Sequence, residues 1–293
     1  MCIAAPGHRV GKHIRSIVPE CYAPCRLCGA APNTVPCSCM NLPEPTLDAF
    51  RGPLAAALEA LVEAYRLSDA GTGSAEDSTP PLLVQAFAQL FEAMQRTEAS
   101  LAEESAVQTG NQASEQDVSE LGEYALELFD QALTWSQRLD LDDVYDVLQG
   151  FVIAMGRWIA RHGGQIFSLE PVVDALARSA NRIQEPERLV PLYRAMGEVM
   201  DATAAAIRQD LEKTNPGRPW RILHLNRAIV ATRTHHPDIM EEAFSVLIRD
   251  LPEDAPGFFS RGMEQMDLLN YPSHVRNVMD RYYRKWSVDR SLH

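Results

Sequence analysis

The chain has 293 residues, of which 46% are hydrophobic and 23% charged, a composition that allows one large folded domain or two small ones. Its formal net charge is −13, yet residues 1–40 hold four basic residues against one acidic residue, so the rest of the chain carries −16. A body this acidic repels nucleic acid and anionic lipid, which excludes both as expected partners, and no apolar run reaches the roughly 20 residues of a membrane span.

The N-terminal segment is basic but has no continuous apolar stretch, which argues against a secretory signal. We therefore expect a cytoplasmic protein whose thiols stay reduced, with import into an organelle matrix by a basic transit peptide as the alternative. In a reducing compartment, clustered cysteines favour metal or redox chemistry over structural disulfides.

Five of the six cysteines lie in one short segment: Cys21, Cys25, Cys28, Cys37 and Cys39. The last four follow a C-x2-C-x8-C-x-C spacing, and the stretch CRLCG resembles a zinc knuckle, in which two thiolates wrap one ion. Four thiolates satisfy a tetrahedral Zn²⁺, and Cys21 is able to replace one of them, so the segment predicts a structural zinc site. An iron–sulfur cluster is the less favoured metal, and a flexible tail without metal is the remaining alternative.

We place this basic, cysteine-rich, non-helical arm at residues 1–42; after it, apolar residues recur at helical spacing. The stretch PLAAALEALVEAYRL predicts a helix with Pro53 in its first turn, where the missing N–H costs nothing. A linker rich in Gly and Ser follows at 68–81, and a second amphipathic helix opens at Pro80. Residues 43–104 are therefore expected to form a helical pair with flexible linkers.

Residues 116–293 form the third predicted domain, a helical-repeat domain. Ser114 and Asp117 resemble a capping box at its start, and one amphipathic helix is expected to run from Leu189 to Ile207. No segment alternates with period two, so we expect no sheet. The predicted fold is all-α: antiparallel helix pairs stacked as a short α-solenoid or an irregular helical bundle, with the arm outside it.

The C-terminal part repeats itself at an offset of 34 residues, which relates Ala228 to Gly262, Phe244 to Val278 and Pro237 to Tyr271. A small residue in the first helix, a large apolar residue in the second and a closing proline at Pro252 resemble the tetratricopeptide repeat. The resemblance covers about residues 220–286. Met240, His274 and Trp286 depart from the family's pattern. The resemblance implies helical hairpins that present a concave, peptide-binding face.

Two further patterns carry candidate binding residues. In the last expected helix, a basic strip stands on an otherwise acidic body: Arg276, Arg281, Arg284 and Lys285. This strip is either a docking surface for an acidic partner or a second subunit, or a capping face whose arginines pair with acidic neighbours. The segment THHPD at 234–238 collects metal-binding residue types, but its spacing does not put two ligands on one helical face, so we interpret it as an interhelical turn.

No nucleotide-binding loop, nucleophile elbow or zinc-protease motif occurs, so we assign no catalytic residue and favour a non-enzymatic function. The sequence predicts a protein-interaction scaffold or adaptor of stacked helix pairs that binds a protein partner, with homo-oligomerisation as a further option. The alternative is an accessory or maturation factor for a metal centre that works through the cluster at residues 21–39. A second alternative is a helical-bundle enzyme without a recognisable motif.

Overall fold

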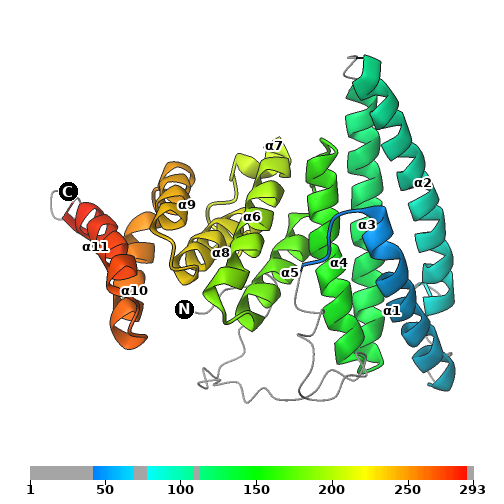
Figure 1. Cartoon of the computed structure of the whole chain (residues 1–293), viewed down its shortest axis with the longest axis horizontal. Coiled ribbons are helices and arrows are strands. Elements are labelled where there is room, and N and C mark those ends of the chain that lie inside the picture. The colour runs from blue at the N-terminus through cyan, green and yellow to red at the C-terminus, as the bar shows by residue number, and fades with distance from the viewer. Residues whose placement is uncertain (1–41, 69–77, 108–111, 289–293) are drawn as a thin grey trace. The chain divides into compact units, whose positions relative to one another are not determined.

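The computed structural model describes residues 42–68, 78–107 and 112–288 (Figure 1). Within these ranges the chain forms eleven helices and no strand, which confirms the predicted all-α fold of stacked helix pairs. None of these helices combines the length and the apolar composition that a membrane crossing requires. The cysteine-rich arm lies outside the described residues.

The described residues divide into two compact units, 42–171 and 172–288. The first two helices therefore belong to the same unit as the two that follow them. The predicted domain limits at residues 42, 104 and 116 stay a prediction, and limited proteolysis of the full chain is the measurement that tests them.

The first unit is a pack of four helices: α1 (Leu47–Leu67), α2 (Pro80–Val107), α3 (Gln112–Arg138) and α4 (Asp142–Arg161). Helix α3 packs against α2 and α4, and α1 packs against α2 and α4. Each helix contributes one buried phenylalanine to a common aromatic core, made of Phe50, Phe87, Phe129 and Phe151. The Phe50 and Phe151 rings meet edge to face at 5.5 Å, and those of Phe87 and Phe129 lie 4.9 Å apart.

Two predicted helix starts in this unit are wrong. Helix α1 begins at Leu47, because the Thr46 hydroxyl caps it by accepting from Ala49 N at 3.4 Å. Pro53 consequently lies in the second turn of α1, where its missing N–H leaves one carbonyl of the preceding turn without its helical donor. Helix α3 begins at Gln112, ahead of the expected capping box at Ser114.

The second unit contains α5 (Leu169–Arg182), which starts at the boundary of the units, and six further helices: α6 (Pro186–Ala202), α7 (Ala205–Arg208), α8 (Pro219–Arg233), α9 (Pro237–Asp250), α10 (Ala255–Leu268) and α11 (Ser273–Val288). Helices α8 and α9 form one hairpin and α10 and α11 a second. The hairpins meet where α9 packs against α11, and α6 packs on α8. Phe244 of α9 joins the hairpins through ring contacts with Phe259 and Tyr282, each at 5.2 Å.

The prediction of a single helix from Leu189 to Ile207 is also wrong. Helix α6 ends at Ala202, and the short helix α7 starts at Ala205 in a new direction. Thr203 lies at the break, with an extended backbone and a hydroxyl that donates to Val199 O at 2.8 Å. The apolar stripe continues across the break, which is why the sequence pattern does not show it.

The two hairpin turns match at an offset of 35 residues rather than 34. His235 and Asn270 both have a left-handed backbone, with φ of 62° and 50°, and each is followed two residues later by the proline near the start of the next helix. Pro237 therefore corresponds to Pro272, and its expected match with Tyr271 is wrong. The centroids of the His235 and Tyr271 rings are 5.4 Å apart, which shows that the two turns lie next to each other.

Candidate functional site

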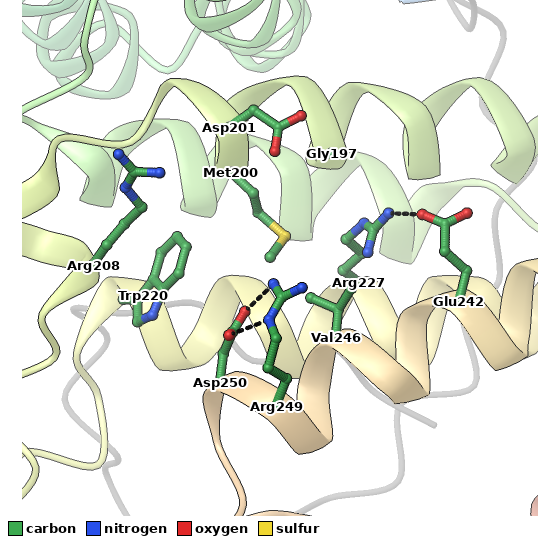
Figure 2. Close-up of a pocket in the computed structure, with 10 residues that line it drawn as sticks. All are labelled: Gly197, Met200, Asp201, Arg208, Trp220, Arg227, Glu242, Val246, Arg249 and Asp250. Carbon is green, nitrogen blue, oxygen red and sulfur yellow. Dashed lines mark hydrogen bonds and ion pairs between the residues drawn. The ribbon is translucent and has the colours of Figure 1, made fainter.

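The second unit has an open cavity of about 560 Å³ between α6, α7, α8 and α9, which we call the groove (Figure 2). Six charged side chains line it: Asp201, Arg208, Arg227, Glu242, Arg249 and Asp250. Its apolar lining comes from Met200, Trp220 and Val246, of which the first two are buried. The lining thus has three basic and three acidic residues around buried apolar side chains. Such a surface suits the recognition of a polar ligand.

Arg227 on α8 is held from three sides. Its guanidinium lies over the Tyr193 ring, 4.2 Å from the centroid, and its Nη2 donates to Glu242 Oε1 at 2.7 Å. Gly197 on α6 leaves room for it, because a Cβ at this position would lie 3.5 Å from Nη2. The Arg227 side chain is 9% exposed, whereas that of Glu242 is 58% exposed, so the arginine is fixed and its acid partner faces water.

Arg227 Nε, a buried donor at this position, lacks an acceptor among the described residues, and the buried Tyr193 hydroxyl interacts with Glu242 and Arg227. Burial raises the pKa of Tyr193, and the nearby Glu242 carboxylate adds to the increase, so the hydroxyl stays protonated and able to donate. A buried donor without an acceptor is costly.

The other end of the groove is built on Asp250. Arg249 donates to both Asp250 oxygens, at 2.7 and 2.8 Å, and the buried His224 ring lies with Nε2 at 3.8 Å from Asp250 Oδ2, beyond hydrogen-bond distance. Burial lowers the pKa of His224 to about 4, although the charge of Asp250 opposes this, so the imidazole is neutral at pH 7. Burial alone would raise the pKa of Asp250, but the Arg249 hydrogen bond and the charges of His224 and Arg249 lower it overall.

Asp201 and Arg208 complete the rim. Both side chains are exposed, and neither makes a hydrogen bond or ion pair with any residue in the described ranges. Figure 2 places them on the α6 and α7 side of the cavity, with Trp220 beside Arg208. These two opposite charges are available to a ligand.

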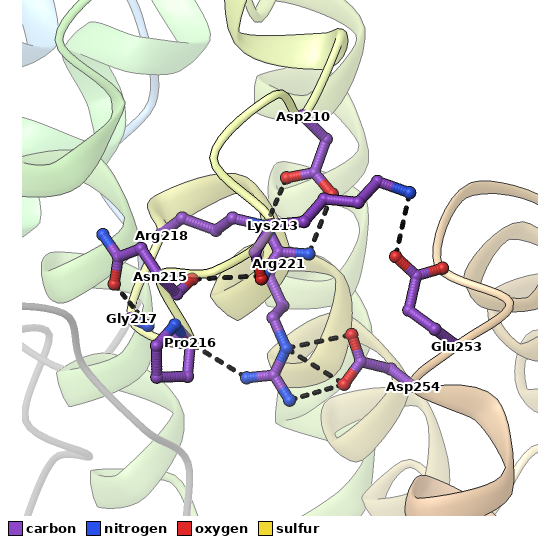
Figure 3. Close-up of polar contacts among 9 residues, drawn as sticks. All are labelled: Asp210, Lys213, Asn215, Pro216, Gly217, Arg218, Arg221, Glu253 and Asp254. Carbon is purple, nitrogen blue, oxygen red and sulfur yellow. Dashed lines mark hydrogen bonds and ion pairs between the residues drawn. The ribbon is translucent and has the colours of Figure 1, made fainter.

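A clamp of ion pairs fixes the loop that connects α7 to α8 (Figure 3). Arg218 forms a buried two-pronged pair with Asp210, with Nη2 at 2.8 Å from Oδ2, and this hydrogen bonding raises the pKa of Arg218. Arg221 grips Asp254 in the α9–α10 turn, with Nε at 2.9 and 3.0 Å from the two oxygens, and Lys213 reaches Glu253 at 3.0 Å. The clamp sets where Arg208 and Trp220, at the two ends of the loop, line the groove.

The predicted basic strip on α11 is largely engaged within the unit. Arg276 donates to Asp267 Oδ1 at 2.5 Å, Arg281 pairs with Glu241, and Arg284 donates to Asp280 Oδ1 at 3.0 Å. Lys285 is exposed. Exposed pairs of this kind contribute about 1 kcal/mol or less and exchange readily, so partner binding by the strip stays a prediction.

The predicted zinc ligands Cys21, Cys25, Cys28, Cys37 and Cys39 lie outside the described residues, so the metal site stays a prediction. Where the structure does describe the chain, no group of three or more His, Cys, Asp or Glu side chains is placed to hold a metal ion. Residues 234–236 of the segment THHPD form the turn between α8 and α9, as expected, and Pro237 and Asp238 begin α9. His236 faces Glu187, with 3.3 Å between Nε2 and Oε1.

No sequence motif identified the groove as a site, although α8 carries a signal. Its apolar residues cover all sides of the helix, which indicates that neighbouring elements surround it. His224, Asn226 and Arg227 are therefore buried polar residues, and each of them needs a partner or a cavity. The acidic residues that complete the groove come from α6 and α9. No pattern within one helix shows that these residues lie close to Arg227 in the folded protein.

Comparison with models of protein families, with curated proteins and with solved structures finds no match to this chain.

Proposed function

We propose that this chain is a non-enzymatic protein-interaction scaffold built from stacked helix pairs, and that the groove binds a segment of a partner protein. The observation that supports this most is the groove itself: four helices, α6, α7, α8 and α9, surround an open cavity of about 560 Å³. Rigid helices hold its side chains in place before a ligand arrives, which reduces the entropy cost of binding.

The repeat pattern agrees with this proposal. Ala228 and Gly262, the small residues of the two repeat units, are both buried, and a Cβ on Gly262 would lie 2.7 Å from Met279 Sδ, so α10 and α11 approach closely there. Close pairing of a small residue with the following helix is what the tetratricopeptide pattern implies. We therefore propose tetratricopeptide-like hairpins that extend a wall beside the groove.

Substitutions at Gly197 test the proposal. Leucine there would extend from α6 against Arg227 and fill part of the cavity, whereas alanine adds a Cβ at an ordinary 3.5 Å from Arg227 Nη2. We expect tagged full-length protein and Gly197→Ala to retain the same partner from a cell extract, identified by mass spectrometry, and Gly197→Leu to lose it. Equal retention by Gly197→Leu, at an unchanged melting temperature, would place the binding surface elsewhere.

A further inference from the structure

The chemistry of the groove indicates which part of a partner it binds, and this inference rests on the function proposed above. Arg227 donates to Glu242 through Nη2, and its guanidinium forms part of the cavity lining. Its Nε and the Tyr193 hydroxyl are fully buried, so a ligand meets the guanidinium only where it lines the cavity. An acceptor oxygen of a ligand gains a hydrogen bond to a charged donor there.

The charge of the groove indicates whether the acceptor of a ligand is an anion or a neutral carbonyl. Its lining has three arginines and three acidic residues, and residues 172–293 as a whole contain 17 Lys and Arg and 17 Asp and Glu. A site that is neutral at both scales does not attract an anion from a distance. A neutral carbonyl, in contrast, meets no repulsion from Glu242 or Asp250.

Exchange at Glu242 leads to the same conclusion. A ligand carboxylate that took the place of Glu242 on Arg227 would replace one charged hydrogen bond by another, for little net gain. A carbonyl that binds alongside Glu242 accepts from the part of the Arg227 guanidinium that lines the cavity, and keeps the existing ion pair. The exposed Asp201 is an acceptor for an N–H group, and Arg208 is a donor for a second carbonyl.

We propose that the groove binds a net-neutral, extended segment of a partner protein mainly through its main chain. Carbonyl oxygens of the segment accept from the guanidinium groups of Arg227 and Arg208, and an N–H group donates to Asp201. An apolar side chain of the segment rests on Met200, Trp220 and Val246. Main-chain recognition supplies the affinity, and the apolar base selects the side chain.

The test starts from short random peptides displayed on phage and selected on the full-length chain. We expect enrichment of one apolar position without enrichment of charged residues. Synthetic copies of the selected peptides should change their Kd by less than about threefold between roughly 50 mM and 500 mM salt, because neutral groups are not screened. Replacing single peptide bonds by esters, which weakens the carbonyl acceptor, should weaken binding at one or two positions.

Variants of the chain sharpen this test. Arg227→Lys keeps the charge but loses the planar fork, so the Kd should rise by about tenfold, equivalent to about 1.4 kcal/mol. Glu242→Gln should leave binding unchanged or weaken it, because Glu242 orients Arg227. Glu241→Gln, one residue away and paired with Arg281 outside the groove, is the matched control and should have no effect. Gly197→Leu, or Asp201→Trp at the exposed rim, should abolish binding.

Two results would overturn the inference in distinguishable ways. A steep salt dependence, together with binding that Glu242→Gln strengthens by about tenfold, would identify a carboxylate that replaces Glu242 and would contradict only the main-chain proposal. Failure to select any peptide, or selected peptides that Gly197→Leu and Asp201→Trp do not affect, would contradict the groove as a binding site and with it the proposed function.

Discussion

At the scale of single residues, the Asp210–Arg218 pair explains how the loop between α7 and α8 holds its shape. Both side chains are almost completely buried, at 8% and 6% exposure, and Arg218 also donates to Asn215 O at 3.1 Å. Removing one member of a buried pair leaves the other charge without compensation, which costs more than the pair contributes.

We therefore predict that Asp210→Ala lowers the free energy of unfolding by about 3–5 kcal/mol, measured by urea denaturation. Asp267→Ala, which breaks the exposed pair with Arg276, is the control and should cost less than about 1 kcal/mol. Similar small losses for both variants would mean that the loop is not held by its buried ion pair.

His224 gives the protein a specific dependence on pH. Its pKa in the folded state is about 4, below its ordinary value of 6.5, so the unfolded chain binds a proton first as the pH falls. The contribution to stability is therefore lost progressively below about pH 6.5 and down to about pH 4. Asp250, Arg227, Arg249 and Asp210 are the charges that act on this group.

Between about pH 7 and about pH 5 this linkage removes about 2 kcal/mol of stability from the wild-type protein. We predict that His224→Gln, which has no titrating group, loses correspondingly less over the same range in urea unfolding curves. If the pH dependence of His224→Gln matched that of the wild type, His224 would not be buried in its neutral form.

For single residues, the sequence predicts which side chains are buried better than it predicts which side chains contact each other. The apolar core residues follow from helical spacing, and pairing of the α11 arginines with acidic neighbours, as Arg281 pairs with Glu241, was one of the two alternatives for the basic strip. The groove residues were not predicted, because Arg227 and Glu242 meet only once α8 and α9 are packed together. A contact between helices depends on tertiary packing, which no pattern within one helix encodes.

At the scale of helices, close packing of α3 on α4 depends on a glycine. A Cβ added at Gly122 would lie 2.5 Å from Ile159 Cδ1, well inside the contact distance of two carbon atoms. At this position the clash that a side chain would cause with Ile159 outweighs the gain in helix propensity from alanine.

We predict that Gly122→Ala destabilises the protein by about 1–3 kcal/mol through overpacking, which exceeds the gain of about 1 kcal/mol in helix propensity. Gly257→Ala in α10 is the control, because its Cβ would meet only Arg261 Nη2 at 3.9 Å, and it should be neutral or stabilising. Thermal unfolding followed by circular dichroism measures both. A stabilised Gly122→Ala would show that α3 and α4 are farther apart than described.

Helix positions were predictable where one apolar stripe belongs to one helix, as in α2, which begins at Pro80 as expected. They were less predictable where a helix breaks under a continuous stripe. The break at Thr203 is an example, because apolar residues lie on both sides of it. The offset between the hairpin turns also differs by one residue from that of the helices, since His235 and Asn270 set the turns through their left-handed backbone. Turn geometry and side-chain periodicity thus carry separate information.

At the scale of the whole molecule, charge is divided unevenly along the chain. Residues 41–171 contain 6 Lys and Arg against 22 Asp and Glu, whereas 172–293 contain 17 of each. The acidity of the body therefore belongs to the α1–α4 part of the sequence, and the groove belongs to the neutral part. Association through the groove should for this reason depend little on salt.

The cysteine-rich arm provides the prediction on metal content. If Cys25, Cys28, Cys37 and Cys39 bind Zn²⁺, full-length protein purified under reducing conditions with zinc supplied should hold about one equivalent, and Cys37→Ser should lose it. A chelator should leave the helical circular dichroism nearly unchanged, because the described helices have their own cores. Metal content near zero would contradict the zinc site, and a brown colour would indicate an iron–sulfur cluster instead.

The most direct test of the account is whether a partner occupies the groove in cells. A photo-reactive amino acid at Arg249, an exposed residue of the lining that takes no part in the proposed contacts, should crosslink to a partner protein on illumination, whereas the same group at Ala205, exposed but outside the lining, should not. We predict one partner adduct at position 249 that disappears when Gly197→Leu is added. Adducts of equal yield at both positions, or an adduct that Gly197→Leu leaves unchanged, would contradict the groove as the binding site.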